Sequence, residues 1–378
     1  MRVFLEPTEP LLFRTGRSFD AGESSFADTL FPPTPETLQG AMRAAIATYW
    51  DSSKSLEELF LDPKLTDLIG SRGSGYGRFR ITGLALGRRK VDGTVERLFS
   101  SPAHLLKVED GRGDKQLMLL KPKKRAGVTS DLGKDEYYLF PEYKGEEKPE
   151  PFEDWLTESG LEKILRASTQ LTENESVREE DMFRYESRLG IGMDNAKKTT
   201  REGYLYSMRV IRMQPDYGFV IDIRLSKPGI SPDIPYLESL MDDAQTQEKL
   251  PLPEKGWLML GGERRTARFE IMPSPANGSE QVKQGNLLYL ATPAAFGDGW
   301  LPGQSLASPI AAAIDRYQPI GGWELNLGNS GGNNKIMRRC IPAGSVYFFE
   351  QEVSVTQPLT DYGMEIGYGI AYTGEWQQ

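Results

Sequence analysis

Residues 2–19 (RVFLEPTEPLLFRTGRSF) and 31–49 (FPPTPETLQGAMRAAIATY) predict a strand, a loop and a helix, in that order. The strand covers residues 2–5, where apolar side chains dominate. Thr34 can cap the helix, and Pro35 fits its first turn, where a missing N–H costs nothing. The chain therefore begins with a strand that a glycine-containing loop connects to a capped helix.

Apolar residues recur at helical spacing from Leu38 to Tyr49, so one face of this helix should pack on a core. Gln39 and Arg43 are expected to point away from that face. A second helix is expected from Ser55 to Ile69. The beginning of the chain is therefore the most helical part of the sequence.

Beyond residue 70 the pattern changes to strands. Residues 78–83 alternate polar and apolar side chains, which is typical of a half-buried strand. Residues 204–213 and 217–225 flank a plausible hairpin turn at 214–216. Further strands are predicted at residues 116–120, 136–140, 256–260, 266–272, 286–292, 343–350 and 369–376. The predicted class is α+β, with two antiparallel-sheet domains at residues 1–190 and 191–378.

The 378 residues carry a net charge of −9, which argues at first against nucleic-acid binding. The charge is unevenly distributed, however. Residues 142–181 hold 13 acidic and five basic residues and show helical patterns, so they predict an acidic helical insertion. Residues 70–91 hold basic side chains and no acidic one, and 121–125 read KPKKR. Such segregation is compatible with a cationic groove on an acidic protein.

The chain has one cysteine, Cys340, and one histidine, His104. It can form no internal disulfide and no zinc site of the cysteine–histidine type, and it offers little for acid–base catalysis. We predict no cofactor and no metal. No signal peptide is evident, and no apolar run approaches the roughly 20 residues of a membrane helix. A cytoplasmic protein that does not contact a membrane is expected.

Several glycine-containing loops carry basic residues, and these loops are the main functional signal. They lie at residues 14–17, 192–203, 261–268 and 331–339. Glycine lets backbone N–H groups approach a phosphate, and arginine adds paired donors. Nearby aromatic and methionine side chains could stack on unpaired bases. Single-stranded RNA binding is the hypothesis that these loops favour.

The same loops resemble the Cmr-type (type III-B) third-subunit family, which belongs to the RAMP superfamily of CRISPR effector proteins. The resemblance follows residues 4–19, 31–43, 188–206, 260–265, 321–323, 338–347 and 367–369 in order. It implies two ferredoxin-like (RRM-related) domains with glycine-rich loops. It also implies a non-catalytic subunit that holds the 5′ tag of the guide RNA (crRNA). Its implied partners in a hetero-oligomeric complex are a large polymerase/cyclase-like subunit and a backbone RAMP subunit.

The RNA-binding residues predicted from this resemblance are Arg14, Gly16, Arg17, Gln39, Arg43, Lys197, Lys198, Arg201, Arg264, Arg265, Lys335, Arg338 and Arg339. Three alternatives stay open at this point. The chain could be the equivalent subunit of another type III complex. It could be a RAMP endoribonuclease that uses His104 as general acid or base. It could also be a protein-docking scaffold that never touches RNA.

Overall fold

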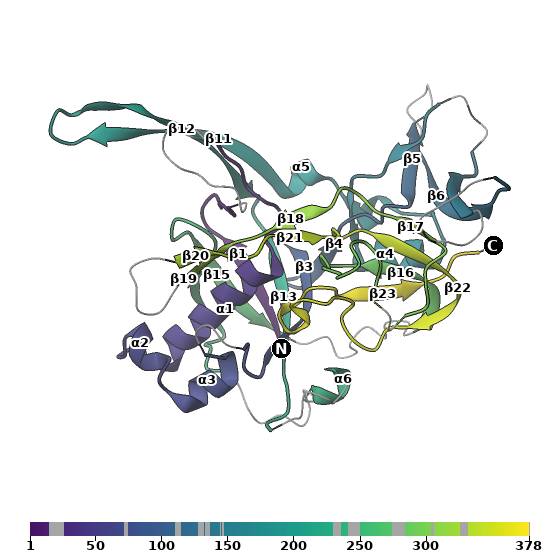
Figure 1. The fold of residues 1–378 in the computed structure, drawn as a ribbon. Coiled ribbons are helices and arrows are strands. Elements are labelled where there is room, and N and C mark those ends of the chain that lie inside the picture. Colours follow the sequence, from purple (N-terminus) through teal and green to yellow (C-terminus); the bar gives the residue numbers. More distant parts are fainter. Residues whose placement is uncertain are drawn as a thin grey trace.

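The computed structural model describes residues 1–14, 26–71, 75–109, 115–127, 132, 137–143, 145, 147–229, 236–240, 250–273, 284–303, 306–325 and 332–377. Mostly antiparallel sheets make up the fold, and helices pack around them (Figure 1). The predicted α+β class is confirmed. The helices are α1 (Pro35–Trp50), α2 (Leu56–Leu59), α3 (Pro63–Ile69), α4 (Glu158–Leu165), α5 (Glu179–Met182) and α6 (Tyr236–Ser239), with 3₁₀ segments η1 (Glu173–Glu175) and η2 (Met364–Ile366).

The largest sheet has eight strands in the order β10-β9-β4-β3-β13-β1-β15-β14. They are β1 (Arg2–Pro7), β3 (Phe79–Arg89), β4 (Val95–Phe99), β9 (Trp155–Thr157), β10 (Ser176–Val177), β13 (Tyr217–Leu225), β14 (Lys255–Met259) and β15 (Thr266–Met272). The first strand lies inside this sheet. It pairs antiparallel with both β13 and β15, so Phe4 lies opposite Val220 on one side and Glu270 on the other.

The boundary predicted between residues 190 and 191 lies within a strand, β11 (Phe183–Asp194). Strands from both sides of that residue share the eight-stranded sheet, because β13, β14 and β15 join β1, β3 and β4 there. The two predicted halves are therefore connected through one continuous hydrogen-bonded sheet.

Helix α1 begins at the predicted residues. The hydroxyl of Thr34 accepts a hydrogen bond from the N–H of Thr37 at 3.3 Å, and Pro35 occupies the first turn. The face that includes Leu38 and Met42 is buried in the core of the large sheet. The helix contacts the edge strand β14.

A second sheet near the C-terminus has four strands in the order β17-β22-β16-β23. They are β16 (Gln284–Leu290), β17 (Ala311–Ala313), β22 (Val346–Ser354) and β23 (Ala371–Gly374). Helix α4 completes its core, because Leu161 and Ile164 are buried together with Leu287 and Phe348. A helix from the acidic stretch 142–181 thus supports the second sheet.

The described residues form four further sheets, of which the three-stranded sheet that contains β11 is described below. The four-stranded one has the order β7-β6-β5-β8, and the pairs β18-β21 and β19-β20 form two-stranded sheets. Their strands are β5 (Leu105–Glu109), β6 (Lys115–Lys124), β7 (Tyr137–Pro141), β8 (Glu150–Pro151), β18 (Gln318–Ile320), β19 (Trp323–Leu325), β20 (Gly332–Asn334) and β21 (Arg338–Cys340).

The acidic stretch 142–181 is only partly helical, because it also contributes the strands β8, β9 and β10. Its longest helix, α4, begins at Glu158. The preceding residues 155–157 pair with β4 and β10 instead. Thr157 ends that strand and caps the helix, since its hydroxyl accepts the N–H of Gly160 at 3.2 Å.

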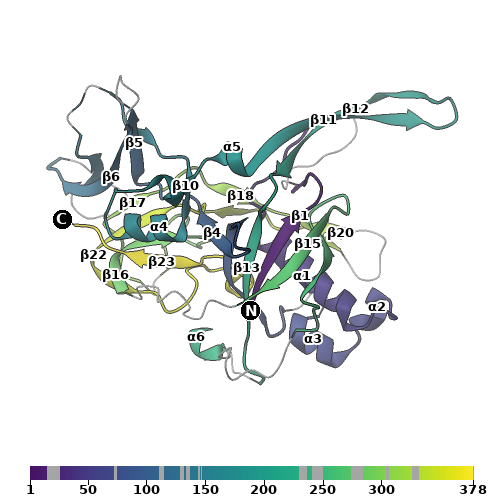
Figure 2. The same cartoon turned by 180° about the vertical axis from the view of Figure 1, so that it is seen from behind.

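Strands β11 and β12 (Thr199–Met213) form a long hairpin that we call the arm, residues 183–213. It extends away from the rest of the molecule (Figures 1 and 2). A short strand, β2 (Phe26–Ala27), pairs with β12 near its base. The strands predicted at 204–213 and 217–225 exist, but the hairpin between them is wrong, because β12 pairs with β11 and β13 pairs with β1 and β3.

His104 belongs to the interior of the structure. Its side chain is 1% exposed and packs edge-on against Phe348, with ring centroids 5.7 Å apart. Neither ring nitrogen has a hydrogen-bond partner. Burial lowers the pKa of His104 to about 3, because a charged imidazole would lose its hydration there.

This buried imidazole predicts a pH-dependent stability between pH 5 and 6.5. The folded protein keeps His104 neutral while the unfolded chain binds a proton near the ordinary pKa of about 6.5. Its contribution is therefore complete above that pH and is lost as the pH falls. Below about pH 6.5, the free energy of unfolding should therefore fall by about 1.4 kcal/mol per pH unit because of His104. This slope should be absent from the variant His104→Leu.

Urea unfolding at several pH values measures this slope directly. His104 is the only histidine, so carboxylates are the main other groups that titrate near this window. Equal slopes in both proteins would contradict the buried, neutral imidazole.

Candidate nucleic-acid interface

Residues 11–14 and 26–31 form the centre of the candidate interface, and we call them the central segment. Leu11 exchanges two backbone hydrogen bonds with Ile211 in the arm, at 2.7 and 2.9 Å. The carbonyl of Phe13 accepts the N–H of Leu30, and Arg14 forms a bridge with Thr29. The two halves of the central segment therefore lie against each other and against the base of the arm.

A tight turn at residues 260–265, the glycine turn, rests on the central segment. The N–H of Gly262 donates to the carbonyl of Leu12 at 2.9 Å. Gly261 has a φ of +78°, and a Cβ there would lie 2.9 Å from the same carbonyl oxygen. Only glycine fits both constraints, since a side chain would be strained and would crowd the backbone.

The glycine turn brings three predicted residues together. A Cβ on Gly262 would lie 3.9 Å from Cγ of Arg14, so Arg14 stands beside the turn. Arg264 is exposed and has a φ of 55°, while Arg265 pairs with Glu263 at 2.9 Å. Among the described residues Arg264 has no ion pair. The predicted Gly16 and Arg17 lie outside the described residues.

On the other side of the central segment, four residues form what we call the tyrosine cluster: Glu36, Lys335, Arg338 and Tyr362. Tyr362 donates a hydrogen bond to Glu36, which also pairs with Lys335 at 3.4 Å. The guanidinium of Arg338 lies 3.7 Å from the centroid of the Tyr362 ring. Burial and the Glu36 carboxylate raise the pKa of Tyr362, so its hydroxyl stays protonated as a donor.

Leu30 links this cluster to the central segment, because Leu30 and Tyr362 pack against the same small core and the N–H of Leu30 donates to the carbonyl of Phe13. Arg339 lies just beyond, exposed, with its guanidinium 5.4 Å from the centroid of the Tyr317 ring. Ile336, which lies between Lys335 and Arg338 in the sequence, is 77% exposed. Arg338 and Arg339 thus lie in strand β21 beside tyrosine rings, and Lys335 lies three residues before this strand.

The two predicted α1 residues have internal roles. Gln39 was expected to point away from the core, but it is 6% exposed, so that expectation is wrong. Arg43 donates to the carbonyls of Gly70 and Ser71 at 2.7 and 2.5 Å. Its guanidinium also lies 5.1 Å from the centroid of the Phe60 ring. Arg43 therefore ties α1 to the end of α3.

The predicted loop at residues 192–203 is the tip of the arm rather than a link between domains. Lys197 and Lys198 are exposed there, and Asp194 shapes the turn by accepting the N–H of Lys197 at 3.2 Å. Lys198 has a φ of 54°. The side chain of Arg201 lies outside the described residues. The tip stands apart from the glycine turn and the tyrosine cluster (Figure 1).

The arm carries an apolar face that the sequence interpretation missed. Leu189, Ile191 and Leu205 are 78%, 47% and 59% exposed. They share one face, since Ile191 pairs with Leu205 and Leu189 lies two residues away on β11. The alternation of residues 185, 189, 191 and 193 with polar or glycine positions is a period-2 signal that could have revealed this strand.

Arginines at the arm base were also missed. Arg209 pairs with Asp28 at 2.8 Å and lies 4.7 Å from the centroid of the Tyr185 ring. Arg212 pairs with Glu186, which also binds Arg188 at 3.2 Å. The carboxylates fix these guanidinium groups in place, and each ion pair leaves further N–H donors on arginine.

Within the described part of the chain, no cluster of three or more histidine, cysteine or acidic residues is arranged to hold a metal ion. His104 is buried and faces none of the basic loops named above. The helices that the structure describes include none that is both long and apolar enough to cross a bilayer.

A family model described as CRISPR-associated protein (Cas_Cmr3) matches residues 3–376. One similar structure is a cryo-EM structure of the Type III-B Cmr-beta bound to cognate target RNA and AMPPnP, state 1, with 18% identity, a TM-score of 0.47, and 92% of this chain and 86% of that chain covered. Another, of the Type III-B Cmr-beta bound to cognate target RNA, has 16% identity, a TM-score of 0.48 and the same coverages. No curated protein matches the sequence. Because the family model spans nearly the whole length, this chain belongs to the CRISPR-associated Cmr3 family.

Proposed function

We propose that this protein is a non-catalytic, RNA-binding subunit of a type III-B CRISPR effector. It would anchor the 5′ tag of the guide RNA and dock the large polymerase/cyclase-like subunit onto the backbone. One observation carries the RNA-binding part: the central segment is hydrogen-bonded to the glycine turn and to the base of the arm, and it shares a small core with the tyrosine cluster. Basic groups from distant parts of the sequence thereby belong to one connected region.

This region has the chemistry that a single RNA strand requires. Arg14 and Arg264 are exposed beside the backbone of the glycine turn, where N–H groups and guanidinium groups can bind phosphate. Arg338 and Arg339 lie against tyrosine rings, and the exposed Ile336, two residues before Arg338, adds apolar surface. Cations beside aromatic and apolar side chains suit unpaired nucleotides.

The arm adds a second binding element in this proposal. Its exposed lysines at the tip can bind phosphates, and its apolar face can pack against bases or a neighbouring subunit. Exposed apolar surface of this kind marks an interaction site. The backbone RAMP subunit and the large subunit are the partners that the family relationship suggests.

We also propose that the first sheet contains a ferredoxin-like unit. Its four strands follow one another in the chain as β1, β3, β13 and β15, with α1 after the first and α6 before the last. In the sheet they lie in the order β3-β13-β1-β15, and each neighbouring pair is antiparallel. This is the split β-α-β arrangement, with the insertion of β4 to β12 between its second and third strands.

Two rivals remain open to direct tests. The equivalent subunit of another type III complex would differ in its partners, so the composition of the purified complex decides between them. An endoribonuclease that uses His104 is disfavoured by the burial of that side chain, which no substrate could reach without opening the core.

Removing the charge of the arm tip should weaken binding of the tag RNA. Each lysine that contacts phosphate contributes about 0.7 to the salt slope of single-strand binding. The variant Lys197→Gln/Lys198→Gln should therefore lower the slope by about 1.4 in filter-binding titrations. Lys54→Gln/Lys64→Gln, which removes two exposed charges near α2 and α3, serves as the control. An unchanged slope in the arm variant would favour the scaffold hypothesis.

The glycine turn offers a matched pair of substitutions. Gly261→Ala adds a methyl group at positive φ against the Leu12 carbonyl, whereas Gly262→Ala meets the same oxygen at 3.4 Å without a positive φ. The first should cost about 1–3 kcal/mol of stability. It should also weaken RNA binding several-fold by displacing Arg264, while the second stays near wild type. Equal effects of both on affinity would show that the turn geometry does not matter for RNA.

The purified protein should leave repeat RNA intact, with or without Mg²⁺, because His104, the base of the endoribonuclease alternative, is buried. Gel analysis of labelled repeat RNA measures this. Metal-independent cleavage that disappears in His104→Ala would overturn the non-catalytic assignment.

A further inference from the structure

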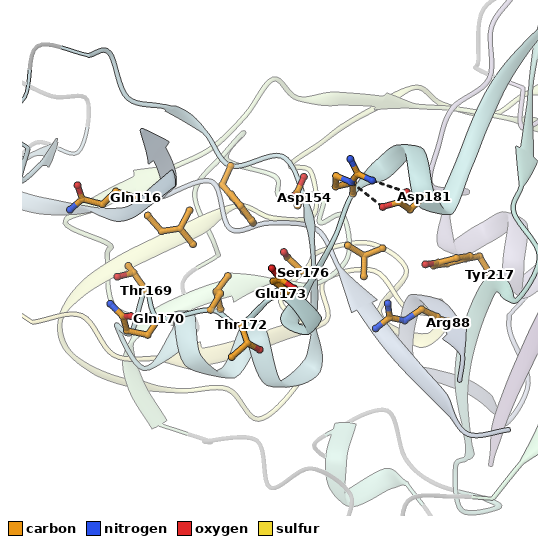
Figure 3. Close-up of a pocket in the computed structure, with 15 residues that line it drawn as sticks. Arg88, Gln116, Asp154, Thr169, Gln170, Thr172, Glu173, Ser176, Asp181 and Tyr217 are labelled. Atoms are coloured by element: carbon orange, nitrogen blue, oxygen red, sulfur yellow. Dashed lines mark hydrogen bonds and ion pairs between the residues drawn. The ribbon is translucent and has the colours of Figure 1, made fainter. Parts of the chain in front are cut away.

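A groove in the acidic part of the chain lies outside the basic region described above. It has a volume of about 780 Å³ and runs from Gln116 in β6 to Tyr217 in β13 (Figure 3). The segment from Thr169 to Val177 and the residues around Asp154 form its walls. Pockets of this size hold ligands larger than a single ion or water cluster.

The charges of this groove are not balanced. Both arginines that line it are already paired: Arg88 with Glu96 at 2.7 Å, and Arg178 with Asp181 at 3.0 Å. Asp154 and Glu173, which also line it, take part in none of the ion pairs of the described residues. Asp154 is half-buried, so its charge is less screened than that of a surface carboxylate. Besides the hydrogen bond to Asp181, the charge of Asp154 also acts on Arg178 and raises its pKa, but three carboxylates and two arginines line the groove, so its net charge is negative.

Acidic residues beside the groove strengthen this field. Partial burial and the nearby charge of Glu153 raise the pKa of Glu179, which stands two residues before the groove residue Asp181. Such a surface repels the phosphates of RNA and attracts lysine and arginine.

The shape and floor of the groove suit an extended polypeptide. Strand β10, which lines it with Ser176 and Val177, is the outermost strand of the eight-stranded sheet. An edge strand presents backbone N–H and C=O groups to which another strand can add. Leu117, Phe152 and Leu171 supply apolar contacts along the same wall.

We propose that this groove binds an extended, basic segment of a partner protein, which pairs with the edge of β10 and places lysine or arginine side chains at Asp154 and Glu173. The inference does not depend on RNA binding elsewhere in the chain. It assigns to the acidic stretch 142–181 a docking role distinct from that of the basic region.

The test uses the full-length protein and a fluorescein-labelled peptide of alternating arginine and valine, RVRVRVRV, with fluorescence anisotropy as the readout. The variant Asp154→Asn/Glu173→Gln should weaken binding about fivefold or more, because it removes the two unpaired charges. The control Glu350→Gln/Glu352→Gln removes two exposed carboxylates that do not line the groove and should bind as wild type does. Equal losses in both variants would overturn the proposal, since they would indicate attraction to net charge alone.

Two further comparisons test whether the peptide pairs with β10 and whether the groove binds RNA instead of protein. The peptide RPRPRPRP has the same charge as RVRVRVRV but lacks half of the backbone N–H donors. It should therefore bind the protein more weakly. Equal binding would contradict pairing with β10. Labelled single-stranded RNA, titrated without the peptide, should bind the wild type and Asp154→Asn/Glu173→Gln with similar affinity, and a loss of RNA affinity in this variant would identify the groove as a nucleic-acid site instead. Lys197→Gln/Lys198→Gln should leave peptide binding unchanged, whatever its effect on RNA.

Discussion

The paired backbone hydrogen bonds between Leu11 and Ile211 hold the functional part of this protein together. They join the chain just after β1 to the base of the arm, although the two residues lie 200 positions apart. Phe31 reinforces the junction by packing on Phe183 at the start of β11, with ring centroids 4.3 Å apart. An isolated two-stranded hairpin is marginally stable in water, so the arm depends on this anchored base for its orientation.

The acidic net charge and the basic interface are reconciled by how the carboxylates are used. Around the central segment, three of the described acids are paired with cations: Asp28 with Arg209, Glu36 with Lys335, and Glu263 with Arg265. These pairs orient the cations and leave Arg264 to act without a counter-charge among the described residues. At the groove beside β10 the reverse holds, because the arginines are paired and two carboxylates are not. Different regions of one acidic chain can therefore attract partners of opposite charge.

Local features of this fold could be predicted from the sequence, whereas partners distant in the chain could not. The cap at Thr34 and the strands on either side of residues 214–216 follow from short-range chemistry, and all are present. The hairpin predicted at 214–216 does not form, because β12 and β13 belong to different sheets. Strand pairing depends on packing between distant segments, which the local sequence does not reveal. The burial of Gln39 was not predicted for a related reason. The chain around α1 covers this polar side chain as well as the apolar face of the helix. Arg43 shows the same limit, because its carbonyl partners come from α3 and the residue after it.

The candidate site was predictable as a set of loops but not as one surface. Glycine and arginine marked the turn at 260–265 and the segment at 335–339, yet nothing in the sequence showed that the central segment connects them through Leu12 and Leu30. The arm was not predicted because residues 192–203 were interpreted as a glycine-containing basic loop, although the alternation from Tyr185 to Met193 is that of a strand. Apolar side chains such as Leu189 stay exposed on it, and burying them can stabilise only a complex, not the isolated chain. The same residues that leave the arm unsupported in the monomer therefore make association with a partner favourable.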